Sequence, residues 1–175
     1  MSHPEQMHYI SKLKNKFPMF FENLKVLEIG SLNINGTIRV FFKNCNYLGV
    51  DLGEGKDVDY ICEGQKLEFE SNSFDVTASC ECFEHNPYWI ETFKNMFRMT
   101  KNNGLIIMTC ATLGRAEHGT KRTSPENAPL LIWDYYKNLT EEDFKKEFNL
   151  DLMFSEYSFE INNNSKDLYF YGIKK

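Results

Sequence analysis

Two acidic residues stand at positions where a parallel sheet would place them beside a ligand. Glu28 lies near the end of the apolar run at residues 26–29, just before Gly30, and Asp51 ends the next apolar run. Short apolar runs bounded by polar turns are typical of strands buried on both faces, and ligands bind where such strands end. A carboxylate can accept two hydrogen bonds from the diol of a ribose. The pattern therefore predicts a site for a nucleotide-like cofactor.

Two histidines could move a proton at the same edge. His85 follows Glu84 just after the expected strand at residues 74–80, and His118 lies in a long polar segment after the strand expected at residues 105–110. Imidazole titrates near neutral pH, so either side chain could act as a general base. The alternatives are a structural role for His85, as a helix cap or a partner of a backbone carbonyl, and a place in a solvated loop for His118.

The elements that must position these residues alternate along the chain. Strands are expected at residues 26–29, 47–51, 58–62, 74–80, 105–110, 153–161 and 168–173. Helices are expected at residues 7–21 and at residues 37–42. Two further helices are expected to begin at caps: one at Asn86, with Pro87 as its first helical residue, and one at Thr140, with Asp143 in its first turn. Only a few residues separate the second and third strands, so the crossover helix there is almost absent or one of these strands is wrong. The last two strands have no helix between them and should form an antiparallel hairpin.

The alternation predicts an α/β fold in a single domain of 175 residues. Residues 1–22 form an N-terminal helical segment in this interpretation. Residues 111–138 make a long polar stretch of the kind that usually serves as a lid or a binding loop.

The loop after the first strand narrows the choice of cofactor. A dinucleotide-binding loop would have glycines at positions 30, 32 and 35, whereas this chain has Gly30, Leu32 and Asn35. A phosphate-binding P-loop would need Gly-Lys-Ser/Thr at the start of the helix, and this stretch has no such motif. The remaining interpretation is a cofactor that carries a ribose but passes this loop without phosphates.

Five short motifs follow one another along almost the whole chain. They are VLEIG at residues 26–30, GVD at 49–51, FDV at 74–76, EH at 84–85 and NGLII at 103–107. The set resembles the class I S-adenosylmethionine-dependent methyltransferases, most closely the small type 11 group. The resemblance implies a Rossmann-like, doubly wound sheet of seven mostly parallel strands, in the order 3-2-1-4-5-7-6 with strand 7 antiparallel. The loop SLNINGT departs from the family's usual glycines at Leu32 and Ile34 and is similar to a variant with an Asn-x-Asn-Gly loop.

The resemblance also implies which residues contact the cofactor. They are Glu28, Gly30, Ser31, Asn33, Asn35, Asp51, Leu52, Glu63, Gly64, Gln65, Cys80 and Glu81. The loop after the first strand would line the methionine half, Asp51 would hold the ribose, and Glu63 would accept from the adenine amine. Cys80 and Glu81 would lie beside the sulfonium. The alternatives are a helix-capping or solvent-facing acid at Glu28 and ordinary strand-end or surface acids at Asp51 and Glu63.

The long segment offers residues for the methyl acceptor. Arg115 or Arg122 could pair with a carboxylate or phosphate, and Tyr135 and Tyr136 could wall a pocket for a sugar or a flat ring. Each arginine could equally belong to a solvated loop, and the tyrosines could simply pack the lid on the core. Methyl transfer from a sulfonium mainly requires alignment of the two reactants, so a base is needed only when the nucleophile must lose a proton.

Composition excludes some partners and favours others. The net charge of −5 argues against a nucleic-acid partner, and no apolar run approaches the length of a membrane span. Five cysteines, an odd number, fit buried reduced thiols in a cytoplasmic protein. The Cys80-Glu81-Cys82 spacing is too short for a zinc pair, so no metal is expected.

The sequence therefore predicts a cytoplasmic S-adenosylmethionine-dependent methyltransferase that acts on a small molecule, for example a sugar, a glycan precursor or a secondary metabolite. A non-catalytic binding or partner subunit with the same fold is the main alternative, because the glycine loop is altered. A nicotinamide-dependent oxidoreductase is disfavoured by the missing glycines.

Overall fold

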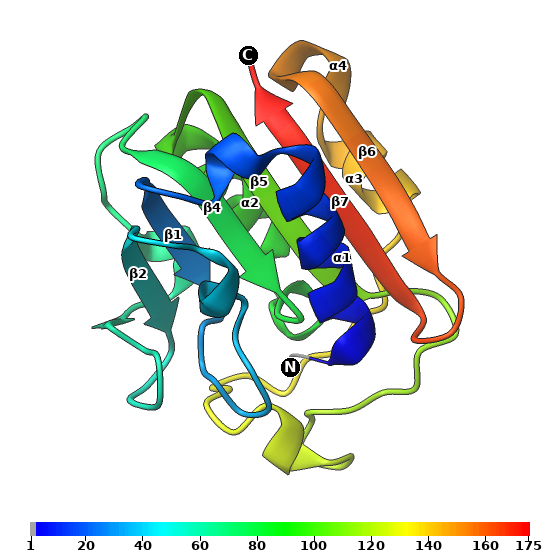
Figure 1. Ribbon diagram of the computed structural model, residues 1–175. Coiled ribbons are helices and arrows are strands. Elements are labelled where there is room, and N and C mark those ends of the chain that lie inside the picture. The colour runs from blue at the N-terminus through cyan, green and yellow to red at the C-terminus, as the bar shows by residue number, and fades with distance from the viewer. Residues whose placement is uncertain (1–2) are drawn as a thin grey trace.

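The computed structural model describes residues 3–175 as a seven-stranded sheet with helices on both faces (Figure 1). The strands are β1 (Lys25–Ile29), β2 (Asn46–Asp51), β3 (Tyr60–Ile61), β4 (Phe74–Cys80), β5 (Thr100–Ala111), β6 (Phe154–Asn162) and β7 (Asp167–Lys174). Their order is β3-β2-β1-β4-β5-β7-β6. Neighbours from β3 to β5 pair in parallel, and β7 is antiparallel to both β5 and β6. The predicted fold class, strand order and terminal hairpin are confirmed.

Helices cover the two faces of the sheet and divide the core into two layers. The helices are α1 (Pro4–Lys16), α2 (Trp89–Met99), α3 (Glu141–Glu147) and α4 (Leu150–Met153). α1 packs on one face, and α2 and α3 pack on the other (Figure 1). Along β5, Leu105 and Ile107 join the α1 layer, whereas Ile106 and Met108 join the α2 layer. Successive side chains of a strand point to opposite faces, so a continuous apolar run is what a strand covered on both faces requires.

The connection between β2 and β3 runs without a helix. β3 has only two residues, where the sequence predicted five, and it pairs with the end of β2 through Tyr60 and Ile61. The chain turns back through a polar loop in which the amide of Gly49 donates to Asp59 Oδ2 at 2.7 Å. The sequence left two possibilities for this connection, an almost absent crossover helix or a wrongly assigned strand. The structure shows the first, because the described residues between β2 and β3 form no helix.

Three expected helices differ from those observed. α1 starts at Pro4 and ends at Lys16, because Pro18 opens a separate 3₁₀ turn; residues 1 and 2 of the expected helical segment lie outside the described residues. The helix predicted at residues 37–42 is a single 3₁₀ turn at Ile38–Phe41. α2 starts at Trp89, because Asn86 Oδ1 accepts from the amide of Tyr88 and closes a turn ahead of the helix.

The predicted start of α3 is confirmed by its hydrogen bonds. Thr140 Oγ1 accepts from the amide of Asp143 at 3.2 Å, and Asp143 Oδ2 accepts from the amide of Thr140 at 2.9 Å. This is a capping box with aspartate in the position more often held by glutamate.

All five cysteines are free, but only Cys80 and Cys110 are buried. No helix within residues 3–175 has the length and apolar character needed to cross a bilayer.

Candidate functional site

A pocket opens at the carboxyl edge of the sheet. The segment at residues 111–138, which the sequence predicted as a lid or binding loop, passes below the strand ends (Figure 1). The pocket encloses about 910 Å³, including solvent space at its mouth. Its walls come from the ends of β1, β2 and β4, from the turn at Gly64, and from residues 127–131 and 133 of the long segment after β5. Pockets in this position are typical of small-molecule sites in open α/β sheets.

Most of the predicted cofactor residues line this pocket: Glu28, Gly30, Ser31, Asp51, Leu52, Gly64, Gln65, Cys80 and Glu81. Asn33, Asn35 and Glu63 are outside the lining. Asn33 donates to Asp57 Oδ2 at 2.6 Å and accepts from the amide of Gly36 at 2.9 Å, so it shapes the loop. Glu63 accepts from Gln65 and pairs with Lys66. The structure therefore gathers the predicted set around one cavity except for these three residues.

Asp51 joins the two loops that cross the pocket. Its Oδ2 accepts from the amide of Leu32 at 2.9 Å, and its Oδ1 accepts from the amide of Leu52 at 2.8 Å. Burial raises the pKa of this carboxyl, while the two amides oppose the rise. Each carboxylate oxygen has a second lone-pair direction, so Asp51 can still accept from a diol in the pocket.

Glu28 is buried and only 4% exposed, which rules out the solvent-facing alternative. Its Oε2 accepts from the hydroxyl of Tyr47 at 2.7 Å. Burial raises the pKa of Glu28 to about 8, partly offset by Tyr47, so the carboxyl is mostly protonated at neutral pH.

Gly30 must be glycine because of its conformation and its neighbour. Its φ is +82°, and a Cβ at this position would lie 2.7 Å from Cys82 Cβ. The loop after β1 therefore passes directly over the turn after β4, and the two together form the floor of the pocket.

The two predicted catalytic histidines lie next to each other, and His85 lines the pocket. The ring centroids of His85 and His118 are 5.0 Å apart, and the ring of Tyr136 lies 5.4 Å and 5.1 Å from them. Burial, followed by the nearby His118, lowers the pKa of His85 to about 3. Its imidazole is therefore neutral at physiological pH. His118 and Tyr136 stand behind it, outside the pocket lining.

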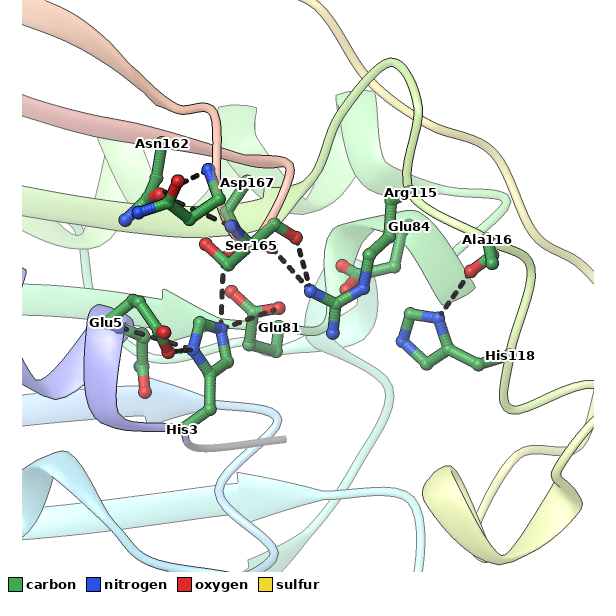
Figure 2. Close-up of polar contacts among 12 residues, drawn as sticks. His3, Glu5, Glu81, Glu84, Arg115, Ala116, His118, Asn162, Ser165 and Asp167 are labelled. Atoms are coloured by element: carbon green, nitrogen blue, oxygen red, sulfur yellow. Dashed lines mark hydrogen bonds and ion pairs between the residues drawn. The ribbon is translucent and has the colours of Figure 1, made fainter.

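The predicted acceptor-binding residues are not brought to the pocket. Arg115 donates to the Ser165 carbonyl and pairs with Asp167 at 3.4 Å (Figure 2). Arg122 is exposed and pairs with Glu117 at 2.7 Å. Tyr135 and Tyr136 are also outside the lining. Both arginines are thus held by acids of this chain.

Sequence reasoning missed part of the site. Gln6 of α1 and Leu130 of the long segment line the pocket, and Leu130 lies against Gly53 in the loop after β2. Trp133 also lines it, and this residue belongs to the aromatic cluster at residues 133–136 that the sequence offered as a pocket wall. Gln6 had no such signal, since one polar residue in an amphipathic helix is ordinary.

Residues 29–108 match the family model described as a methyltransferase domain. The fold is that of a class I methyltransferase. The predicted resemblance is thereby confirmed for the order of the sheet and for residues 29–108. No curated protein sequence matches the chain.

Solved structures with this fold come from diverse organisms. The chain superposes on a phosphoethanolamine N-methyltransferase 2 from Haemonchus contortus, crystallised with S-adenosylhomocysteine, with a TM-score of 0.65, 16% identity, and coverage of 95% of this chain and 52% of that one. A Burkholderia thailandensis 1,6-didemethyltoxoflavin-N1-methyltransferase superposes with a TM-score of 0.66 and 14% identity, over 97% of this chain and 78% of that one. The YcgJ protein of Bacillus subtilis superposes with a TM-score of 0.64 and 13% identity, over 96% of this chain and 99% of that one. The chain spans about half the length of the first of these proteins. At such identities the likeness concerns the fold.

Proposed function

We propose that this chain is an S-adenosylmethionine-dependent methyltransferase whose acceptor is a small molecule. The observation that carries the proposal is the position of Asp51. Asp51 is the last residue of β2, and its carboxylate accepts hydrogen bonds from the loops after β1 and β2. It lines the same cavity as Leu52 and Gly64. A ribose would bind Asp51, and an adenine would lie between Leu52 and the turn at Gly64.

The rest of the pocket suits the methionine half of this cofactor. The backbone of Gly30 and Ser31 lines the cavity on one side, and Cys80 and Glu81, at the end of β4, line it on the other. The carboxylates of Asp51 and Glu81 on the pocket wall favour a sulfonium cation. Homologous folds crystallised with S-adenosylhomocysteine support the same cofactor.

The acceptor would enter between His85 and the lid residues Leu131 and Trp133. In the transfer, a bond forms between the acceptor's nucleophilic atom and the methyl carbon, and the carbon–sulfur bond breaks to leave a neutral thioether. Where the accepting group is a hydroxyl or a protonated amine, its proton must leave to expose the lone pair that attacks, and His85 is the histidine of the pocket wall that could accept it. The enclosed cavity and the net charge of −5 favour a free small molecule over a nucleic acid.

The first test is calorimetric titration of S-adenosylmethionine and S-adenosylhomocysteine into wild type and Asp51→Ala. Hydrogen bonds to a charged group are worth about 1.5–3 kcal/mol, so we expect roughly 10- to 100-fold weaker binding in the variant. Glu54→Ala removes an exposed acid three positions along the same loop and should bind as wild type does.

The competing function is a non-catalytic partner subunit, which the replacement of the usual loop glycines by Leu32 and Ile34 favours. Absence of binding by a folded wild type would support that function and refute ours. Tight binding of reduced nicotinamide cofactor would refute both.

A further inference from the structure

Three potential metal ligands converge behind the wall of the pocket. Glu84 and His85 belong to the short 3₁₀ turn Phe83–His85 after β4, and His118 comes from the lid. One ligand atom of each side chain lies within 4.8 Å of the others. His85 Nε2 is 4.0 Å from Glu84 Oε1. Two imidazoles and one carboxylate therefore come close together at this place (Figure 2 draws Glu84 and His118).

Glu84 is buried in a way that calls for a cation. Its side chain is 0% exposed, and neither carboxylate oxygen has a hydrogen-bond partner among the described residues. Burial, reinforced by the negative field of Glu81, raises the pKa of Glu84 to about 8, although the amides of Glu84 and Ala111 are close enough to oppose the rise. A buried carboxyl without hydrogen bonds is costly unless another group compensates it.

The two histidines are oriented as ligands. His118 Nδ1 lies 3.0 Å from the Ala116 carbonyl, and in the tautomer that donates this bond the Nε2 lone pair is free (Figure 2). A backbone carbonyl on the remote ring nitrogen is the usual arrangement for a metal-binding histidine. His85 is 5% exposed, and its Nδ1 has no partner among residues 3–175.

The charged groups around this point are compatible with an added cation. Arg115 is close enough to His118 to lower its pKa, after the larger effect of burial. The Arg115 guanidinium is itself paired with the buried Asp167. Glu81 adds a second negative charge near Glu84.

We propose that Glu84, His85 and His118 bind one divalent first-row transition ion such as Zn²⁺. Imidazole and carboxylate ligands suit Zn²⁺, Co²⁺ or Mn²⁺, whereas Mg²⁺ and Ca²⁺ prefer oxygen alone. Metal–ligand bonds of about 2.1 Å require the three ligand atoms to approach one another by roughly 1 Å. The ion leaves coordination positions open, and His85 places it at the pocket wall. Ion and proton then compete for the same two imidazoles, so His85 acts as a base only in the metal-free protein.

The test is titration of metal-depleted protein with Zn²⁺ and Co²⁺, followed by calorimetry and by the visible absorption of Co²⁺. Wild type should bind one equivalent, and neither Mg²⁺ nor Ca²⁺ should compete. Glu84→Gln and His118→Ala should each weaken binding by at least about 100-fold, because each removes a ligand. His118→Gln serves as a second variant if the alanine form does not fold.

Two matched variants locate the ion. His3, Glu81 and Asp167 form a second cluster with the same ligand spacing, so His3→Ala tests whether the ion binds there. His8→Ala removes an exposed histidine of α1. Both should bind Zn²⁺ as wild type does.

The proposal is overturned if folded wild type binds no equivalent of Zn²⁺ or Co²⁺, if His118→Ala and His118→Gln bind normally, or if His3→Ala abolishes binding. Thiolate-to-cobalt charge transfer would also overturn it, because it would assign the ion to cysteines. The metal titration uses no S-adenosylmethionine. Failure of this proposal is therefore distinguishable from failure of the proposed methyltransferase function.

Discussion

At the scale of single residues, His3 connects α1 to the edge that carries the pocket. Its Nε2 lies 3.0 Å from Asp167 Oδ2 and 3.7 Å from Glu81 Oε2, and its Nδ1 lies 3.1 Å from Glu5 Oε2 (Figure 2). Burial lowers the pKa of His3, but the carboxylates, Asp167 first, outweigh it and raise the pKa to about 10. His3 is therefore a cation in the folded protein at neutral pH.

The expected consequence is a pH-dependent loss in His3→Asn. Asparagine keeps a cap for α1 but cannot carry the charge. Because the pKa of His3 is about 10 in the folded protein and the ordinary pKa of histidine is 6.5, the stabilisation is fully present below pH 6.5 and is lost as the pH rises through 10. We expect the variant to be less stable by about 1–2 kcal/mol at pH 6 and equal to wild type above pH 10 or so. Urea unfolding at several pH values measures this difference, and a constant difference would contradict the assignment.

At the scale of elements, the capping box decides where α3 begins and thus how Phe144 enters the core. Phe144 is fully buried, and its ring lies 5.4 Å from Phe93 of α2 and 6.5 Å from Phe170 of β7. A short helix has little stability of its own, so its position depends on the cap and on this packing.

Thr140→Ala should lower the free energy of unfolding by about 1 kcal/mol, because the amide of Asp143 loses its acceptor. Glu142→Ala is the matched control, since Glu142 is an exposed residue of the same helix. Denaturant unfolding of both variants is the measurement, and equal stabilities would show that packing alone positions α3.

At the scale of the whole molecule, Lys174 joins the end of β7 to segments beside the starts of β4 and β5, at the sheet edge away from the pocket. Its Nζ donates to Asn72 Oδ1 at 2.8 Å, to the Phe97 carbonyl at 2.8 Å and to the Thr100 carbonyl at 2.7 Å. These partners lie before β4, near the end of α2 and at the start of β5. The side chain thus satisfies acceptors from three separate parts of the fold.

Lys174→Met should destabilise the protein by about 2–3 kcal/mol, because buried acceptors lose their donor while the apolar volume is kept. Lys146→Met on the exposed side of α3 should change stability little. Thermal unfolding compares the two variants. A negligible effect of Lys174→Met would mean that water replaces the ammonium group.

The elements and the cofactor edge of the pocket could be predicted from the sequence because their signals are local. Apolar runs such as residues 105–110 mark strands covered on both faces, and Thr140 with Asp143 marks a helix start within four residues. The positions of Glu28, Asp51 and Glu81 at the pocket could then be predicted from the strands, because a residue at a strand end reaches the carboxyl edge in any parallel sheet.

The lid and the polar contacts beyond it were decided only by the tertiary structure. Arg115 pairs with Asp167, which is 52 positions away, and His118 meets Glu84 and His85 only because the lid folds back over the turn after β4. No periodicity encodes such contacts, because a loop's position depends on which carboxylates, carbonyls and apolar surfaces the finished sheet presents to it. Asn33 and Glu63 lie outside the pocket for the same reason, since Asp57 and Lys66 are better placed to bind them.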